Sequence, residues 1–170
     1  PNFIGIAVHN GDPMTVSAYD NGANFSGFPG MNVNRKYLGE SVSTTGMEGF
    51  YDQAVAEPTN CDVAVTGTYD AGGSITAVVT ATFAAEVTTE HRLAAILVEN
   101  DVTETASGYD QSNYYSFQSQ DLALVSPNSG GMANFDWQGA TNPVAAADMV
   151  YDHVGRTLYG GYDGQSSSIS

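Results

Sequence analysis

The strongest constraint on the fold is the alternation of residue types in CDVAVTGTYDAGGSITAVVTATF, residues 61–83. From Ile75 to Phe83 every second residue is apolar, and most of the residues between them are threonine. A period of two places successive side chains on opposite faces of a strand. Asp70-Ala71-Gly72-Gly73 supplies turn residues after a similar run that includes Val63, Val65 and Tyr69. The segment therefore predicts a β-hairpin.

A third strand is expected soon after this hairpin. Residues 93–98 are apolar at every position, which is typical of a strand buried on both faces. Three antiparallel strands in succession indicate an immunoglobulin-like β-sandwich. The chain contains one cysteine, Cys61, so this interpretation rests on the strand pattern and not on a Cys–Trp–Cys signature.

Residues 1–58 have a different pattern. Phe3–Val8 is apolar on both faces and predicts a central strand of a parallel sheet, covered by helices. A short helix is expected around 14–19, and a short strand around 31–33. Residues 46–58 have apolar residues at helical spacing and end at Pro58. Strand, helix, strand and helix before a sheet-rich region predict an α+β chain.

The remaining residues complete the predicted domain organisation. Within a β-sandwich-like region at 59–161, residues 101–142 have little periodicity and are rich in Gly, Ser, Asn and Tyr, which predicts a long ordered surface excursion. After Asn142-Pro143, the pattern fits either a helix or a short turn followed by a strand from Met149. The tail, residues 162–170, has the composition of a linker.

Charge and composition exclude several classes of partner. The chain has 19 acidic and 4 basic residues, a formal net charge of −15. Nucleic acid and anionic membrane surfaces would repel such a surface, because both bind through Lys and Arg. No run of eighteen apolar residues is present, so we expect no membrane-spanning segment. The many Gly, Ser, Thr, Asn and Tyr residues favour an extracellular or outer-cell-surface location.

Several motifs together resemble a known family. FIGIAVHNGDPM followed by GFPGMNVNRK resembles the later part of a thioredoxin-like fold. The motifs of the family are HNGDPM, RLAAILVENDVT, SGYDQSNYY and MVYDHVGR, and the resemblance covers most of the chain to about Gly161. They resemble the twenty-eight-kilodalton outer-membrane protein family of Bacteroidota. That resemblance implies a thioredoxin-like front half before a β-sandwich, with Pro29 as a possible cis-proline ahead of a strand. The family is described by its location and has no established reaction.

The front half is a partial thioredoxin-like region, because it lacks a CxxC motif. In that fold the motif lies at the start of a helix upstream of anything matching residue 3. Cys61 has no partner and lies in the second region, so this chain cannot perform dithiol exchange by itself. We therefore expect a chain that is not an enzyme and needs no cofactor. Because it opens on Pro1, processing or a longer parent product is expected.

One weak metal site is predicted. Asp101, Glu104 and Asp110 offer the hard oxygen ligands that calcium prefers. Their spacing does not match an EF-hand loop, and a solvated acidic rim is the favoured interpretation of these residues. The three histidines have no second ligand at a familiar offset, and no G-x-S-x-G motif is present, so the sequence predicts no catalytic residue.

The aromatic residues of the excursion are the main binding candidates. They are Tyr109, Tyr114, Tyr115 and Trp137. Exposed Tyr and Trp side chains can stack on sugars or form a protein interface. The alternative is that these rings, with Phe117 and Phe135, hold down the long segment.

Three functions follow as hypotheses. The first is a non-catalytic structural protein that self-associates into a fibre or surface layer, because Phe3–Val8 and the uncharged strand at 75–83 offer backbone and apolar surface that a copy can cover. The second is a surface module that binds glycan or another protein through the aromatic residues. The third is a fragment of a thiol-disulfide oxidoreductase whose CxxC lies upstream.

Overall fold

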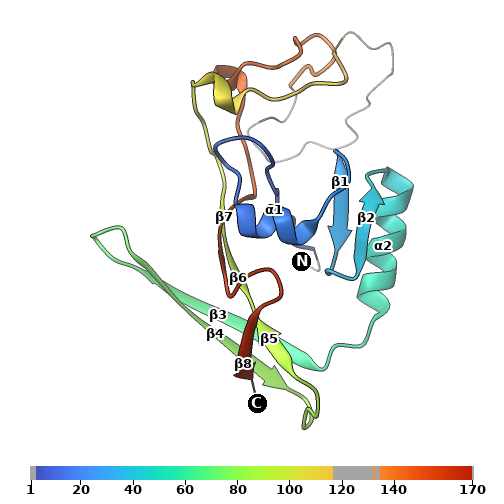
Figure 1. The fold of residues 1–170 in the computed structure, drawn as a ribbon, viewed down its shortest axis with the longest axis vertical. Coiled ribbons are helices and arrows are strands. Elements are labelled where there is room, and N and C mark those ends of the chain that lie inside the picture. The colour runs from blue at the N-terminus through green and yellow to red at the C-terminus, as the bar shows by residue number, and fades with distance from the viewer. Residues whose placement is uncertain (1–2, 117–131, 133–134, 170) are drawn as a thin grey trace. The chain divides into compact units, whose positions relative to one another are not determined.

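A computed structural model describes residues 3–116, 132 and 135–169 of the chain (Figure 1). The described residues form two short α-helices, two 3₁₀ turns and several two-stranded sheets, which confirms the α+β class. Contacts group the chain into two compact units. The first contains Gly22–Ala95 and the residues from Tyr159 onward, and the second contains Ile4–Asn21 and Ile96–Leu158. Within the first unit, the strand at His91–Leu93 in the middle of the chain pairs with the strand at Gln165–Ile169 near its end.

A small hairpin and a helix follow one another in the first unit. β1 (Gly30–Val33) pairs antiparallel with β2 (Tyr37–Ser41), and α2 (Thr44–Ala56) lies against both strands. The Ser43 side chain accepts a hydrogen bond from the backbone N–H of Gly46 and caps α2. The predicted strand and helix are confirmed. β2 was not predicted, since its middle residue is Gly39, with φ +69.

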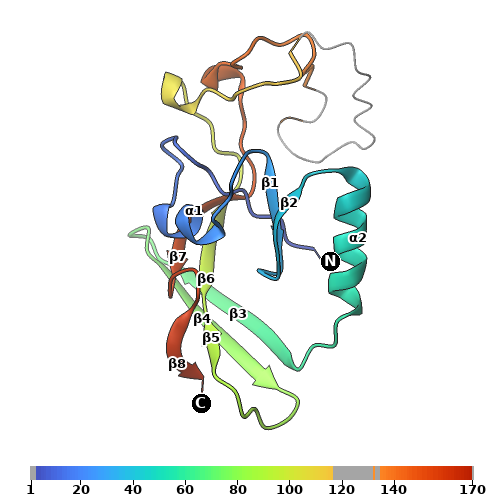
Figure 2. The ribbon, with the colours of Figure 1, turned by 45° about the vertical axis from the view of Figure 1, so that its right-hand side comes forward.

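The predicted long hairpin is confirmed. β3 (Cys61–Tyr69) and β4 (Ile75–Phe83) pair antiparallel over nine residues each, with an unbroken register from Cys61↔Phe83 to Tyr69↔Ile75. Figures 1 and 2 show the two strands as one long ribbon. We call this element the β-ribbon.

The predicted linker at 162–170 is wrong, because this segment contains a strand. β8 (Gln165–Ile169) pairs antiparallel with β5 (His91–Leu93). The glycines before β8 make the turn that leads into it. Gly164 has φ +83, and a Cβ there would lie 2.8 Å from Cβ of Arg92, so only glycine fits. The glycines that suggested a linker are turn residues.

The expected third strand is present but does not join the β-ribbon. β6 (Ala95–Glu99) pairs with β7 (Val154–Tyr159). Among the described residues, β3 and β4 pair with each other and with no third strand. The described chain thus has separate two-stranded sheets, and an immunoglobulin-like sandwich is not assembled within it.

The predicted central strand Phe3–Val8 is wrong in the described structure. Its residues form a single parallel bridge, from Ala7 to Val154, in which the Ala7 N–H donates to the His153 carbonyl at 2.7 Å. Phe3 is 63% exposed and Ile4 is 82% exposed. An apolar run forms a buried strand only where neighbours pair along its whole length, and here one residue pairs.

The first helix begins later than the sequence predicts. α1 runs from Ser17 to Ala23, whereas a helix was expected around 14–19. Asp12 accounts for the difference, because its Oδ1 accepts the Met14 N–H at 2.8 Å and holds a turn there. Asp12-Pro13 therefore starts a turn and not a helix.

The second unit resolves the alternatives left after Asn142-Pro143. A 3₁₀ turn, η2 (Ala146–Asp148), is followed by β7, so the turn-and-strand interpretation is confirmed, although the strand begins at Val154 and not at Met149. A second 3₁₀ turn, η1 (Ser107–Tyr109), lies earlier in the excursion. The Phe28–Pro29 and Asn142–Pro143 peptide bonds are both cis.

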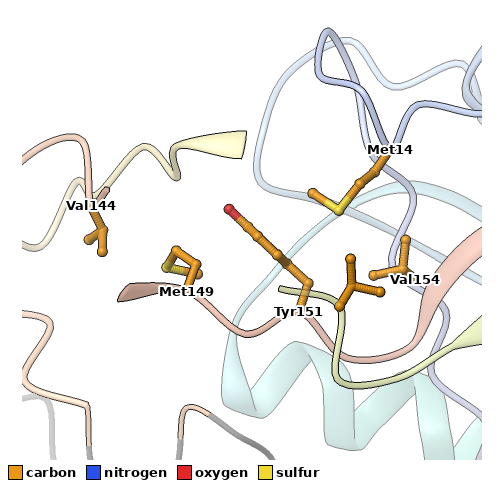
Figure 3. Packing of buried hydrophobic residues seen from close by; sticks show 6 residues of the cluster. Met14, Val144, Met149, Tyr151 and Val154 are labelled. Atoms are coloured by element: carbon orange, nitrogen blue, oxygen red, sulfur yellow. The ribbon is translucent and has the colours of Figure 1, made fainter. Parts of the chain in front are cut away.

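The core of the second unit is small. Figure 3 shows its buried side chains, among which Met14, Tyr151 and Val154 lie close together. The cluster contains Met14, Val102, Val144, Met149, Tyr151 and Val154. Val154 is fully buried, at 0% exposure, where Ala7 bridges it. This residue joins the start of the chain to the start of β7.

We predict that Val154→Ala destabilises the second unit by about 2 kcal/mol, because it removes two buried methyl groups and leaves a cavity. The measurement is denaturant unfolding followed by fluorescence of Trp137, which is the one tryptophan of the chain and packs against this core. Val55→Ala is the matched control, since Val55 is 48% exposed on α2. Equal unfolding midpoints for the two variants would contradict the burial of Val154.

Candidate functional site

The two faces of the β-ribbon differ in chemistry. Because strand residues alternate, cross-strand partners share a face. The apolar face consists of Cys61, Val63, Val65, Gly67, Tyr69, Ile75, Ala77, Val79, Ala81 and Phe83. The threonine face consists of Asp62, Ala64, Thr66, Thr68, Thr76, Val78, Thr80 and Thr82. The sequence predicted this division for β4, and the register extends it to β3.

The apolar face is uncovered towards the turn. Its exposed fractions are 62% at Val63, 65% at Val65, 75% at Tyr69 and 55% at Ile75. Cys61, Val79, Ala81 and Phe83 are partly buried, and the Phe83 ring meets the His91 ring edge-on at 4.8 Å. An isolated two-stranded hairpin is at best marginally stable in water, and a contiguous exposed apolar surface marks an interaction site. This face is the main candidate functional surface.

The ribbon edges have none of the usual features that block pairing. Natural edge strands are protected by lysines, prolines, bulges or short length. Here both strands are nine residues long and the register has no bulge. Between residues 61 and 83 the charged residues are Asp62 and Asp70, and there is no lysine, arginine or proline.

The turn of the ribbon is held by Asp70. Its Oδ1 accepts the backbone N–H of Gly72 at 2.8 Å and of Ser74 at 2.9 Å. The Ser74 hydrogen bond, followed by that of Gly72, lowers the pKa of Asp70, so this carboxylate is charged at neutral pH. A fixed turn holds the ribbon register in place.

The aromatic candidates of the excursion divide into two pairs. Tyr109 and Trp137 pack against the core of the second unit, and the Trp137 ring meets the Phe135 ring edge-on at 4.8 Å. Tyr114 and Tyr115 are 73% and 49% exposed. The second pair presents more surface to a ligand than the half-buried Tyr109 and Trp137. Phe117 lies outside the described residues.

A buried asparagine fixes the position of these two tyrosines, and sequence analysis missed it. Asn113 is 2% exposed. Its amide Nδ2 donates to the Trp137 carbonyl at 2.7 Å, and its Oδ1 accepts the Tyr115 N–H at 3.1 Å. Its own N–H donates to Oδ1 of Asn142 at 2.9 Å. No local sequence signal marks the contacts of Asn113 with Trp137 and Asn142, because these partners lie 24 and 29 residues away.

The second unit also has a hollow of about 400 Å³. Phe135, Asp136, Thr141 and Asp148 are among its lining residues. Oδ1 of Asp136 is occupied by the Gly139 N–H at 2.9 Å. Two carboxylates make this hollow unsuitable for an anion.

The predicted calcium ligands do not form a group. Across residues 3–116, 132 and 135–169, no cluster of three or more His, Cys, Asp or Glu side chains is arranged to hold a metal ion. Asp110 instead accepts the Ala146 N–H at 2.8 Å, and the Asp101 N–H donates to Asp152 at 3.0 Å. Glu104 is exposed. Asp110 is thus used to connect the excursion to η2.

His9 belongs to a polar cluster at the edge of the second core. Its Nδ1 lies 2.6 Å from Oδ2 of Asp12, with the two side chains 12% and 23% exposed. The His9 ring meets the Tyr151 ring edge-on at 5.5 Å, and the Tyr151 hydroxyl donates to the Tyr109 carbonyl. Burial, together with the charges of Asp12 and Asp110, raises the pKa of Tyr151 to about 12. This cluster connects the start of the chain to the excursion.

The remaining reactive side chains are scattered. Sγ of Cys61 donates to the Asp62 carbonyl at 3.5 Å, at the start of β3. His91 contacts Phe83, and His153 lies beside Asn100, with Nδ1 2.9 Å from Oδ1. None of these contacts pairs a nucleophile with a base.

Comparison with family models, with curated proteins and with solved structures finds no match to this chain. Over the described residues, no helix combines the length and the apolar character that crossing a membrane requires. The longest, α2, has 13 residues.

We predict that the second unit loses stability as the pH rises from about 10 to about 12. The fold favours the neutral Tyr151 phenol, since its pKa is raised from 10.0 to about 12, and stability that is present below pH 10 is lost through this interval. Tyr151→Phe cannot ionise, so its unfolding midpoint should fall less over the same interval. The readout is again Trp137 fluorescence in denaturant.

Tyr115→Phe is the control for this measurement, because Tyr115 is 49% exposed in the same unit. It should keep the pH dependence of the parent chain. A Tyr151→Phe variant that loses as much stability as the parent between these pH values would contradict the assignment.

Proposed function

We propose that this chain is a non-catalytic, extracellular or cell-surface structural protein that self-associates as the subunit of a fibre or surface layer. The observation that carries the proposal is the uncovered apolar face of the β-ribbon, with Val63, Val65 and Tyr69 each more than half exposed. Apolar surface of this kind gains free energy when water is removed from it. Association covers it.

The location follows from composition and from the resemblance to the twenty-eight-kilodalton outer-membrane protein family. Few lysines and arginines, many Gly, Ser, Thr, Asn and Tyr residues and a net charge of −15 suit an extracellular surface. A structural role fits a chain whose single cysteine has no thiol partner and whose described histidines face no nucleophile.

The finer fold assignment is part of this proposal. We assign residues 1–58 to a partial thioredoxin-like region. Of the predicted strand, helix, strand and helix, the last three are present as α1, β1 and α2, and α2 packs on β1 and β2. The β-ribbon would be one layer of an immunoglobulin-like sandwich whose facing layer a second copy supplies. Its apolar and threonine faces are the pattern that a sandwich sheet requires.

We predict that the purified chain associates and that salt strengthens the association. Copies with a charge of −15 repel one another at low ionic strength. The screening length falls from about 10 Å at 0.1 M salt to about 3 Å at 1 M, whereas burial of the apolar face remains favourable. Light scattering across this range should show the particle mass increase, and negative-stain microscopy should show the particles. A monomer at every concentration and salt level would contradict the proposal.

A second candidate is a surface module that binds glycan through Tyr114 and Tyr115. The supporting observation is the buried Asn113, which holds the backbone beneath both rings. Tyrosine supplies rigid amphipathic contact area at low entropic cost. Trp137 is not suitable as a test residue, because its ring packs against the core.

We predict, for this candidate, that glycan-array signals decrease in Tyr114→Ala and in Tyr115→Ala and persist in Tyr159→Ala. Tyr159 is 60% exposed at the end of β7, so it controls for the loss of any surface tyrosine. An array without signals, or signals equal in all three variants, would reject the candidate.

A further inference from the structure

We infer that the partner of the β-ribbon is a second copy of this chain, which packs its own apolar face against the first in a two-fold arrangement. This inference rests on the proposed self-association and specifies its contact. In such an isologous contact the same surface occurs on both sides, so it must be complementary to itself. Two observations support that condition.

The first observation is the distribution of charge. The chain carries −15 overall, yet none of the residues on the apolar face is charged. Asp62 lies on the threonine face, and Asp70 lies in the turn. Two copies therefore approach with the least electrostatic cost through their apolar faces. A basic partner would be drawn to other surfaces, where the acidic residues are.

The second observation is Gly67 in the middle of β3. A strand glycine commonly marks a bulge, a bend or a close approach of another chain. The register is unbroken at Gly67↔Ala77, which excludes a bulge. A Cβ at Gly67 would meet only the Thr76 carbonyl, at 3.5 Å, so no other part of the described chain fills this position. The open position leaves room for the close approach of a second sheet.

The sizes of the residues on the apolar face also suit packing against a copy. Gly67 and Ala77 form a cross-strand row of small residues, and the next row towards the turn has the Tyr69 ring, which is 75% exposed. A two-fold axis between these two rows sets Tyr69 of each copy over Gly67 of the other. Packed sheets lie about 10 Å apart, a spacing that large and small residues fill when they alternate.

The test is simple to design because the chain has a single native cysteine, Cys61, which one substitution removes. In a Cys61→Ser background, Ala77→Cys puts a thiol on the apolar face and Thr76→Cys puts one on the threonine face, one residue away on the same strand. Both positions are exposed in the described chain. The assembled protein is treated with a short bis-maleimide and separated on a denaturing gel. We expect a covalent dimer from Ala77→Cys and its loss in Thr76→Cys, with circular dichroism confirming that both variants fold.

The outcomes separate this inference from the proposed function. If light scattering shows only monomers, self-association itself is rejected, and this inference with it. If oligomers form but both variants cross-link equally, the contact does not select the apolar face and face packing is rejected. If oligomers form and neither variant cross-links, the contact lies elsewhere on the chain. Dimer from Ala77→Cys alone supports the two-fold packing.

Discussion

The constraint on which this structure depends is that the apolar face of the β-ribbon has to be covered. The two strands form backbone hydrogen bonds with each other, but this pairing leaves both faces of the sheet open. β3 and β4 pair fully over nine residues each, so the ribbon is locally complete. Val65 and Tyr69 remain 65% and 75% exposed, so the β-ribbon lacks the free energy that burial of its apolar face would contribute. Pairing provides hydrogen bonds, but burial provides most of the free energy of folding. The proposed function follows from that imbalance.

The second unit is stabilised in a different way. Its buried core has few residues, and its long irregular segment is held by polar side chains that bond to distant backbone. Asn113 joins the Tyr114–Tyr115 turn to Trp137, and Asp110 joins η1 to η2. Buried polar groups are stable only when each one is satisfied, and Asn113 has a partner for its backbone N–H, its side-chain oxygen and its amide. A segment with little periodicity is ordered in this way.

Local patterns predicted much of the fold. The β-ribbon, its turn, the helix ending near Pro58 and the strand around Met31 all agree with the structure, because each depends on residues close together in the sequence. Which segments pair with one another as strands was less predictable. The apolar run Phe3–Val8 forms one bridge, and the Gly- and Ser-rich tail forms β8. Composition does not state which segment, if any, lies beside a strand.

The candidate sites show the same difference between what local sequence predicts and what tertiary contacts decide. The sequence by itself determined that β4 has an apolar and a threonine face, that few charges lie near it, and that the chain has one cysteine and a charge of −15. Only the tertiary structure decided that this apolar face is uncovered, that Trp137 is packed while Tyr114 is exposed, and that Asp101, Glu104 and Asp110 do not gather around a metal. The reason is physical: side-chain alternation is a property of neighbouring residues, whereas burial and coordination require residues that only folding brings together.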